Sequence, residues 1–247
     1  MNKLIRNLKF LISYDGSCFK GWQFQPNVRT VQGDIETQIL KLFKNQKINL
    51  IGSGRTDSGV HANEQIASIK LKTDWKLDNI KNALNANLKD DVYIKEILNV
   101  DQNFHARFSA KERSYKYYVS NQYSPQSKLY VWNTKKKLDL KLLNQCSVLI
   151  GKNNDFTNFC KSKSEVKNKI CNIFHSYWEC EDEVFIYSVK ANRFLHHMVR
   201  FLVGTMIEVS RGRIIIDDFK QMLNNQNTAY NPFCAPAKGL FLYKIGY

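Results

Sequence analysis

Residues 54–62 read Gly-Arg-Thr-Asp-Ser-Gly-Val-His-Ala, and the rest of the fold can be worked out from them. An apolar run at 48–51 precedes this stretch and an alternating run at 65–71 follows it. The stretch is therefore predicted to be a loop joining two strands. Its two glycines permit a tight turn. Reactive side chains tend to lie on loops held by rigid neighbours, so Asp57 is the candidate for chemistry.

The alternative reading of Asp57 is structural. An aspartate between a threonine and a serine, before a glycine, is a common turn residue that hydrogen-bonds its own backbone. From the composition of these nine residues alone, the turn role is favoured over a chemical one. Only the remainder of the chain can decide between the two.

Hydrophobic periodicity predicts two similar halves. In the first half, four strands and two helices are expected: strands at 8–14, 48–51, 65–71 and 92–100, helices at 31–43 and 77–88. In the second half, the same pattern gives four strands and three helices: strands at 113–120, 170–179, 184–191 and 240–245, helices at 138–150, 194–210 and 217–223. Asp182 is expected at the turn of the hairpin in this half.

Each half therefore reads β-α-β-β-α-β, the order of ferredoxin-like units. We predict an α+β fold in which two ferredoxin- or RRM-like halves form a continuous mixed, mostly antiparallel sheet with a central cleft. The expected domains are 1–108, which carries the Asp57 loop, and 109–247.

The composition favours a polyanionic partner. The chain has 247 residues and 43% hydrophobic content, so it can bury a core, and its formal net charge is +15. Neutralising phosphates releases condensed counterions, although a lysine-rich composition can also reflect the genome. A solvated face is the alternative for every basic cluster, and for the lysine run at 135–137 the two readings have about equal weight. Basic surfaces are expected at three clusters: Lys135 to Lys137; Lys161, Lys163, Lys167 and Lys169; Arg211 and Arg213.

Other composition features exclude several classes. The six cysteines include no C-x-x-C pair and no zinc-ligand spacing, so no structural metal is expected. The start lacks a signal peptide, and no apolar run approaches the ~20 residues of a membrane helix. A cytoplasmic protein with reduced thiols, and without membrane association, is expected.

Five more stretches carry motifs: Tyr-Asp-Gly-Ser-Cys-Phe-Lys-Gly-Trp-Gln at 14–23, Thr-Val-Gln-Gly at 30–33, Phe-His-Ala-Arg-Phe-Ser-Ala at 104–110 leading to Arg-Ser-Tyr-Lys-Tyr at 113–117, Phe-Leu-His-His-Met-Val-Arg-Phe-Leu-Val-Gly at 194–204, and Ala-Pro-Ala-Lys-Gly-Leu at 235–240. Together with residues 54–62 they resemble the tRNA pseudouridine synthase A family. The resemblance covers nearly the whole chain, in the family's order.

The resemblance assigns four residues. Asp57 is the nucleophile, and Arg200 orients it, because a guanidinium grips a carboxylate in a planar fork. Tyr115 stacks on the target base and takes part in proton transfer. Arg55 is the wedge that fills the place of the flipped base. Without the resemblance, Arg200 reads as a surface helix residue, Tyr115 as strand packing and Arg55 as a phosphate contact.

Neighbouring residues receive no chemical role. Tyr117 and Tyr118 are expected in the core or at a sheet edge, and His61 is expected to hydrogen-bond backbone. His196 and His197, placed on one helix, would point about 100° apart and make a poor metal pair.

The implied function is isomerisation of uridine to pseudouridine at positions 38 to 40 of the tRNA anticodon stem-loop. The reaction moves no atoms in or out, so no cofactor and no metal are expected, and the family resemblance implies a homodimer. Two departures from the family pattern, Ser114 and Cys160, bear on RNA contacts only. The alternatives are a synthase of the same family for another RNA and a non-catalytic, duplicated RRM-like RNA-binding protein. No expected strand of this sequence carries the RNP pattern of lysine or arginine, glycine and an aromatic residue, which counts against the second alternative.

Overall fold

The computed structural model describes residues 4–44, 46–161, 166–225 and 231–247. Lys163, a member of one predicted basic cluster, lies outside them. The chain divides into two compact units. The first unit comprises Met1–Lys111 together with Leu242–Tyr247, and the second comprises Glu112–Phe241. Within the described residues, no helix has the length and apolar character required to cross a membrane.

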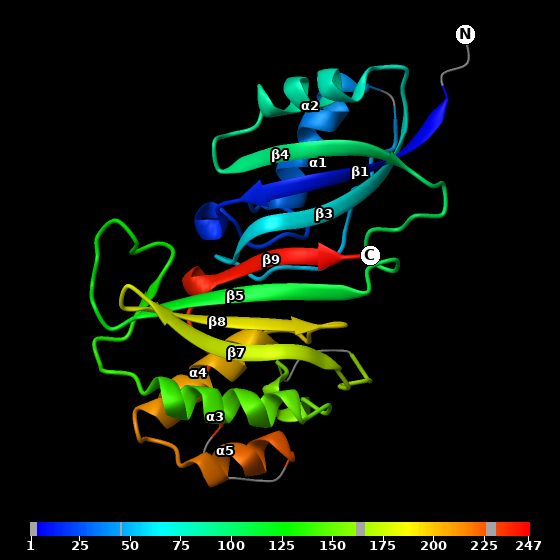
Figure 1. Ribbon diagram of the computed structural model, residues 1–247. Coiled ribbons are helices and arrows are strands. Elements are labelled where there is room, and N and C mark those ends of the chain that lie inside the picture. The colour runs from blue at the N-terminus through cyan, green and yellow to red at the C-terminus, as the bar shows by residue number, and fades with distance from the viewer. Residues whose placement is uncertain (1–3, 45, 162–165, 226–230) are drawn as a thin grey trace. The chain divides into compact units, whose positions relative to one another are not determined.

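The first unit is a small sheet with two helices. Its elements in chain order are β1 (Ile5–Tyr14), the 3-10 turn η1 (Gly16–Cys18), α1 (Val31–Leu42), β2 (Ile51–Gly52), β3 (His61–Lys72), α2 (Leu77–Asn85) and β4 (Val92–Val100). Strand β1 lies between β4 and β3 and is antiparallel to both, and the short β2 pairs with β3 (Figure 1).

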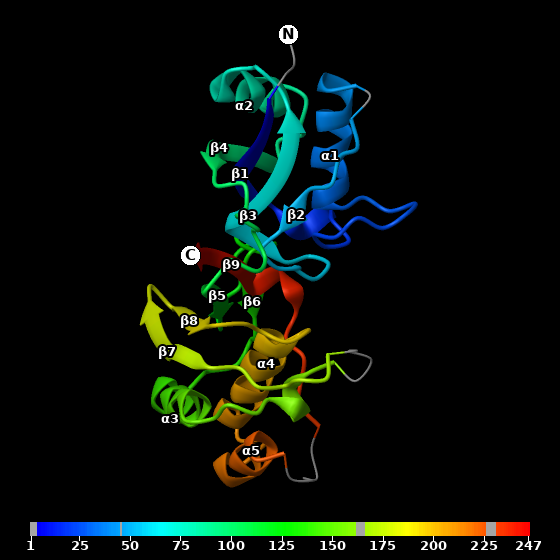
Figure 2. The same ribbon diagram turned by 90° about the vertical axis from the view of Figure 1, so that its right-hand side faces the viewer.

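Alternation in β1 creates the core of this unit. Leu8, Phe10 and Ile12 are fully buried on one face of the strand, as successive side chains point to opposite faces. Helix α1 runs along the sheet (Figure 2) and buries Ile35 and Ile39. The helix begins where the Thr30 hydroxyl accepts a hydrogen bond from the Gly33 N–H, an N-cap that satisfies an otherwise unpaired donor.

The second unit repeats the order with an extra helix. Its elements are β5 (Glu112–Ser120), β6 (Trp132–Asn133), α3 (Leu140–Gly151), η2 (Thr157–Phe159), β7 (Ile173–Glu181), β8 (Val184–Ala191), α4 (Met198–Ser210), α5 (Ile216–Leu223), η3 (Ala237–Gly239) and β9 (Leu240–Gly246), whose residues from Leu242 belong to the first unit. Strand β8 lies between β5 and β7 and is antiparallel to both.

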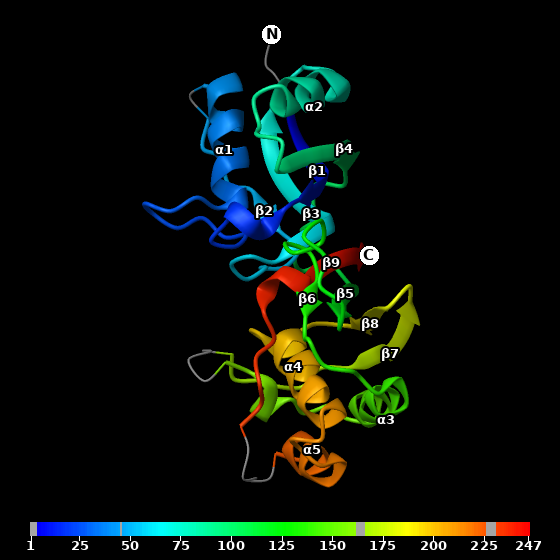
Figure 3. The same ribbon diagram turned by 90° about the vertical axis from the view of Figure 1, so that its left-hand side faces the viewer.

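Helix α4 is the centre of the second unit's core, and α3 and α5 pack beside it (Figure 3). Leu202 and Met206 of α4 are fully buried. The indole N–H of Trp178, on β7, points at the Met206 sulfur at 3.3 Å. Burial on nearly every side explains why this helix is apolar almost all round.

The predicted α+β class, with mostly antiparallel strands and two β-α-β-β-α-β successions, is confirmed, but several details are wrong. The strand at 48–51 shrinks to Ile51–Gly52, because the Leu50 N–H donates to the Glu36 carboxylate at 2.8 Å instead of to a strand. Helix 77–88 ends at Asn85. Strand β6 was not expected, since two residues carry no periodicity.

The helix expected at 194–210 begins only at Met198. His197 precedes it with φ of 64°, a left-handed conformation that cannot continue a helix. His196 and His197 were predicted to be neighbours on a helix. They are instead consecutive residues of the turn before the helix, with ring centroids 4.4 Å apart. The argument that their helical directions separate them is wrong.

Candidate active site

The loop that carries Asp57 joins β2 to β3, as predicted, and is held from inside. Thr56 is buried, and its hydroxyl lies 2.8 Å from the phenol oxygen of Tyr14 at the end of β1. The neighbours of Thr56 in sequence, Arg55 and Asp57, are exposed and partly exposed. Anchoring the middle residue inward presents both predicted functional side chains toward the surface.

The motif at 14–23 forms the wall against which this loop rests. The Trp22 N–H donates to the Thr56 carbonyl at 3.1 Å, and the Gly59 N–H donates to the Phe19 carbonyl at 3.3 Å. Gly21 has φ of 94°, and a Cβ there would lie 2.6 Å from the Thr56 oxygen. Only glycine permits this approach. The sequence motif therefore has a structural meaning: it shapes the loop of Asp57.

Polar side chains fix the base of the loop. Gln65 donates to the Gly54 carbonyl at 2.9 Å and accepts from the Ser53 hydroxyl at 2.7 Å. The buried His61 places Nδ1 3.1 Å from both the Gly16 N–H and an Asp15 carboxylate oxygen. The backbone role expected for His61 is confirmed. Loss of these bonds would release the loop rather than remove a reacting group.

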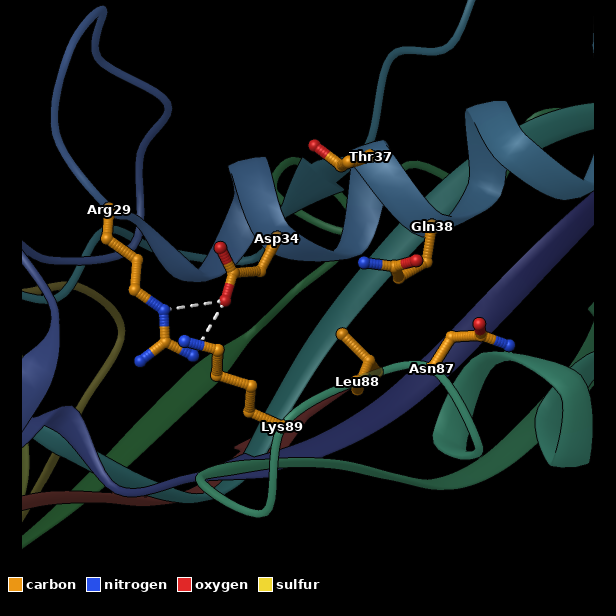
Figure 4. Close-up of a pocket in the computed structure, with 7 residues that line it drawn as sticks. All are labelled: Arg29, Asp34, Thr37, Gln38, Asn87, Leu88 and Lys89. Carbon is orange, nitrogen blue, oxygen red and sulfur yellow. Dashed lines mark hydrogen bonds and ion pairs between the residues drawn. The ribbon is translucent and has the colours of Figure 1, made fainter.

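Arg29 ties the same wall to helix α1. Its guanidinium donates to both carboxylate oxygens of Asp91 and, through Nε, to Asp34 at 2.8 Å. It also lies 4.1 Å from the centre of the Phe19 ring. Arg29 and Asp34 line a pocket of about 260 Å³ (Figure 4). Because Arg29 engages the Asp34 carboxylate, we interpret this pocket as structural.

In the second unit, two tyrosines on β5 differ in their exposure to solvent. Tyr115 and Tyr117 share a face of the strand, as predicted. Tyr117 is fully buried and donates to the Pro236 carbonyl at 2.6 Å, and burial raises its pKa well above the usual value. Tyr115 is half-buried, with Phe194 edge-on at 5.1 Å between ring centroids. The core role expected for Tyr117 is confirmed, which leaves Tyr115 as the accessible tyrosine of the pair.

Arg200 is held by a segment that sequence reasoning did not connect with it. Its Nε donates to the Ala235 carbonyl at 2.8 Å, and the Ala235 N–H donates back to the Arg200 carbonyl at 3.0 Å. We call residues 233–236 the bracket. Gly204, one turn further along α4, lets the bracket approach, since a Cβ there would lie 2.1 Å from the Phe233 oxygen. The motifs at 194–204 and 235–240 thus form one structural unit.

The structure agrees with one predicted basic cluster and contradicts part of another. Lys135 to Lys137 are exposed, as a solvated face would be. Arg211 and Arg213 both bind the carboxylate of the buried Glu208 at 2.8 Å, and the Arg211 side chain is only 11% exposed. A basic surface at Arg211 is therefore wrong: a buried carboxylate needs paired cations, and these arginines supply them.

The two departures from the family pattern have local partners. Ser114 pairs with Lys190 across β5 and β8. The sulfur of Cys160 lies 3.4 Å from the Lys169 ammonium. The side chain of Cys160 therefore has a cation beside it.

Comparison with known proteins identifies the family. A family described as tRNA pseudouridine synthase matches residues 11–109 and 146–247. Proteins named tRNA pseudouridine synthase A align over nearly their whole length: that of Dictyoglomus thermophilum is 40% identical over 98% of this chain and 99% of its own, and that of Borrelia turicatae is 38% identical over 96% and 97%. That of Bacteroides fragilis is 35% identical over 96% and 94%. This chain belongs to the tRNA pseudouridine synthase family.

The predicted residues are divided between the units. Asp57 and Arg55 belong to the first unit, and Tyr115 and Arg200 belong to the second. Thr56 anchors the loop that carries Asp57 and Arg55, Phe194 lies against Tyr115, and the bracket holds Arg200. The ion pair between Asp57 and Arg200, and the cleft that would contain it, stay predictions.

Proposed function

We propose that this protein isomerises uridine to pseudouridine in tRNA, at positions 38, 39 and 40 of the anticodon stem-loop. The observation that carries the proposal is the Asp57 loop: the family's loop sequence is present, and its buried residues and the wall at 14–23 hold one partly exposed carboxylate at its tip. Membership of the family supplies the reaction class.

The main group that the isomerisation requires from the protein is a nucleophile. Pseudouridine forms when the C–N glycosidic bond of uridine breaks and the same ring rejoins the ribose through carbon. An aspartate is ionised at neutral pH and can attack covalently, as the carboxylate of a retaining glycosidase does. Asp57 takes this role, attacking either C1′ of the ribose or C6 of the ring. The C1′–N1 bond breaks and a C1′–C5 bond forms; C5 then releases its proton and N1 takes one up, so the proton count is unchanged.

The other assigned residues prepare the substrate. Arg200 orients the Asp57 carboxylate, and the Nε bond to the bracket fixes the plane of its guanidinium. Tyr115 stacks on the target ring and assists proton transfer from C5. The base has to leave the helical stack, at a cost of a few kcal/mol, and the exposed Arg55 fills the vacated position.

The proposed partner is tRNA, bound through its shape and its phosphates more than through its sequence. The net charge of +15 supports this. By family resemblance, the working form is a homodimer in which each tRNA contacts both subunits. No cofactor is proposed, because the reaction is an isomerisation.

The test is positional mapping of pseudouridine. Unmodified tRNA transcripts are incubated with the purified protein, treated with a carbodiimide that marks pseudouridine and sequenced by primer extension. We expect new stops one nucleotide 3′ of position 38, 39 or 40 only. Product elsewhere in the tRNA, or in another RNA alone, would indicate a synthase with a different target, and binding without product would indicate a non-catalytic RNA-binding protein.

A further inference from the structure

An exposed aromatic side chain marks the turn that follows β4. Among the large hydrophobic residues in the described part of the chain, Phe108 is the most exposed, at 77%. It belongs to the motif at 104–110, which no step of the proposed reaction uses. An apolar ring of this size left in water gains nothing for folding, so burial does not explain why the turn presents it.

The ring of Phe108 is held in place although it is exposed. It stacks on the His105 ring, with centroids 4.3 Å apart and planes 28° from parallel. Nδ1 of His105 accepts the backbone N–H groups of Arg107 and Phe108, both at 3.2 Å. The Ser109 hydroxyl accepts from the His105 N–H at 3.1 Å. The turn therefore closes on the imidazole, and one face of the phenyl ring is covered by it.

The same turn is fastened to the sheet of the first unit. The Ala106 N–H donates to the Ser68 hydroxyl at 3.1 Å, and the Tyr247 hydroxyl donates to the Ala106 carbonyl at 2.8 Å. Phe104 packs against the Tyr247 ring at 4.9 Å between centroids. Asn7 of β1 donates to the Phe104 carbonyl at 2.9 Å. Little conformational freedom remains to be lost when a ligand covers Phe108.

We propose that Phe108, backed by His105 and flanked by Arg107, is a platform on which an unpaired RNA base stacks. The guanidinium carbon of Arg107 lies 5.7 Å from the centre of the phenyl ring, so a cation stands beside the aromatic face. Aromatic rings next to cations are the standard means by which proteins hold unpaired bases. The inference rests on the proposed function, to which it adds a contact distinct from Tyr115.

RNA is a better occupant than a second protein chain because of charge. The net charge of +15 attracts polyanions, and a nucleotide stacked on Phe108 brings a phosphate for Arg107, which an apolar protein surface laid over the ring does not. A pre-ordered platform also suits a base, since stacking needs a flat ring and tolerates any sequence. The occupant is therefore a base of the tRNA that the enzyme binds.

The experiment measures the affinity of the full-length protein for an unmodified tRNA transcript by filter binding, together with pseudouridine formation and thermal unfolding. Phe108→Ala should weaken binding by about 5- to 150-fold, the value of one base stacked on an aromatic ring. Phe108→Trp should bind at least as well as wild type, and its added indole should be quenched by the RNA. The matched control is Tyr93→Ala, which removes a 54% exposed aromatic of β4 and should bind normally.

Each outcome decides the proposal. Wild-type affinity in Phe108→Ala overturns it, as does an equal loss in Tyr93→Ala. A change in sedimentation of Phe108→Ala without RNA would show a second copy as the occupant and also overturn it. If the wild type binds tRNA through Phe108 but makes no pseudouridine, the platform stands and the proposed function fails. If the wild type forms pseudouridine while Phe108→Ala binds tRNA normally, the proposed function stands and the platform fails.

Discussion

Gly204→Ala tests whether the bracket positions Arg200. The added methyl group would lie 2.1 Å from the Phe233 oxygen and 2.7 Å from the Ala235 nitrogen. Both are backbone atoms, so residues 233–235 have to move away from α4. The displacement breaks the bond from Arg200 Nε to the Ala235 carbonyl, now 2.8 Å. Phe233 also loses its 3.1 Å bond to the Thr205 hydroxyl.

The size of the effect follows from three contributions. Overpacking costs about 1–3 kcal/mol, and a hydrogen bond to a charged group is worth about 1.5–3 kcal/mol. Alanine in a helix interior recovers about 1 kcal/mol relative to glycine. We therefore expect the free energy of unfolding to fall by about 1.5–5 kcal/mol. Because a shift of the guanidinium by about 1 Å can cost on the order of 100-fold in rate, activity should fall by a similar factor.

The assays are urea unfolding followed by circular dichroism and the initial rate of pseudouridine formation at saturating tRNA. The control is Gly151→Ala at the end of α3, where a Cβ meets nothing within 4 Å and both quantities should stay near wild type. A Gly204→Ala protein with wild-type stability and rate would refute the role assigned to the bracket. So would an equal loss in Gly151→Ala.

Two more predictions concern tyrosines. Tyr115→Phe should keep tRNA affinity and lower the rate by about 100- to 10,000-fold if its hydroxyl assists proton transfer; an unchanged rate would leave Tyr115 a stacking role only. Burial raises the pKa of Tyr187 well above its usual ~10, so the stabilisation from its neutral form is complete below pH ~10 and declines as pH rises beyond it. Between about pH 10 and 11, the free energy of unfolding should fall less for Tyr187→Phe than for wild type, by about 1 kcal/mol over this pH unit. Parallel urea-melt profiles of the two proteins would contradict this.

Much of the fold followed from periodicity, and its failures share a cause. Helix α1 and strand β4 have regular hydrophobic spacing, and their expected bounds match the structure to within a residue. The strand at 48–51 and the helix start at 194 failed because non-local or backbone effects override spacing there. Leu50 is captured by Glu36, and His197 is left-handed. Neither feature leaves a signal in the spacing of apolar residues.

The candidate site was predicted less completely, because the segments that hold its residues in place lie far from them in the sequence. The position of Asp57 on a loop between two strands could be read from its flanking runs and glycines. The wall at 14–23 and the bracket were visible only as motifs, since their function is to place backbone atoms against Thr56 and Arg200. The tight glycines were the available signal: Gly21 and Gly204 both stand where another backbone segment passes closely.

The most direct test of the central role given to Asp57 is a single-turnover measurement with Asp57→Asn. The substitution keeps the shape of the side chain and removes its negative charge. We predict that the variant binds tRNA within about threefold of wild type and forms no detectable pseudouridine, because an amide cannot replace the carboxylate as nucleophile. Pseudouridine formation at a rate near that of wild type would contradict the mechanism.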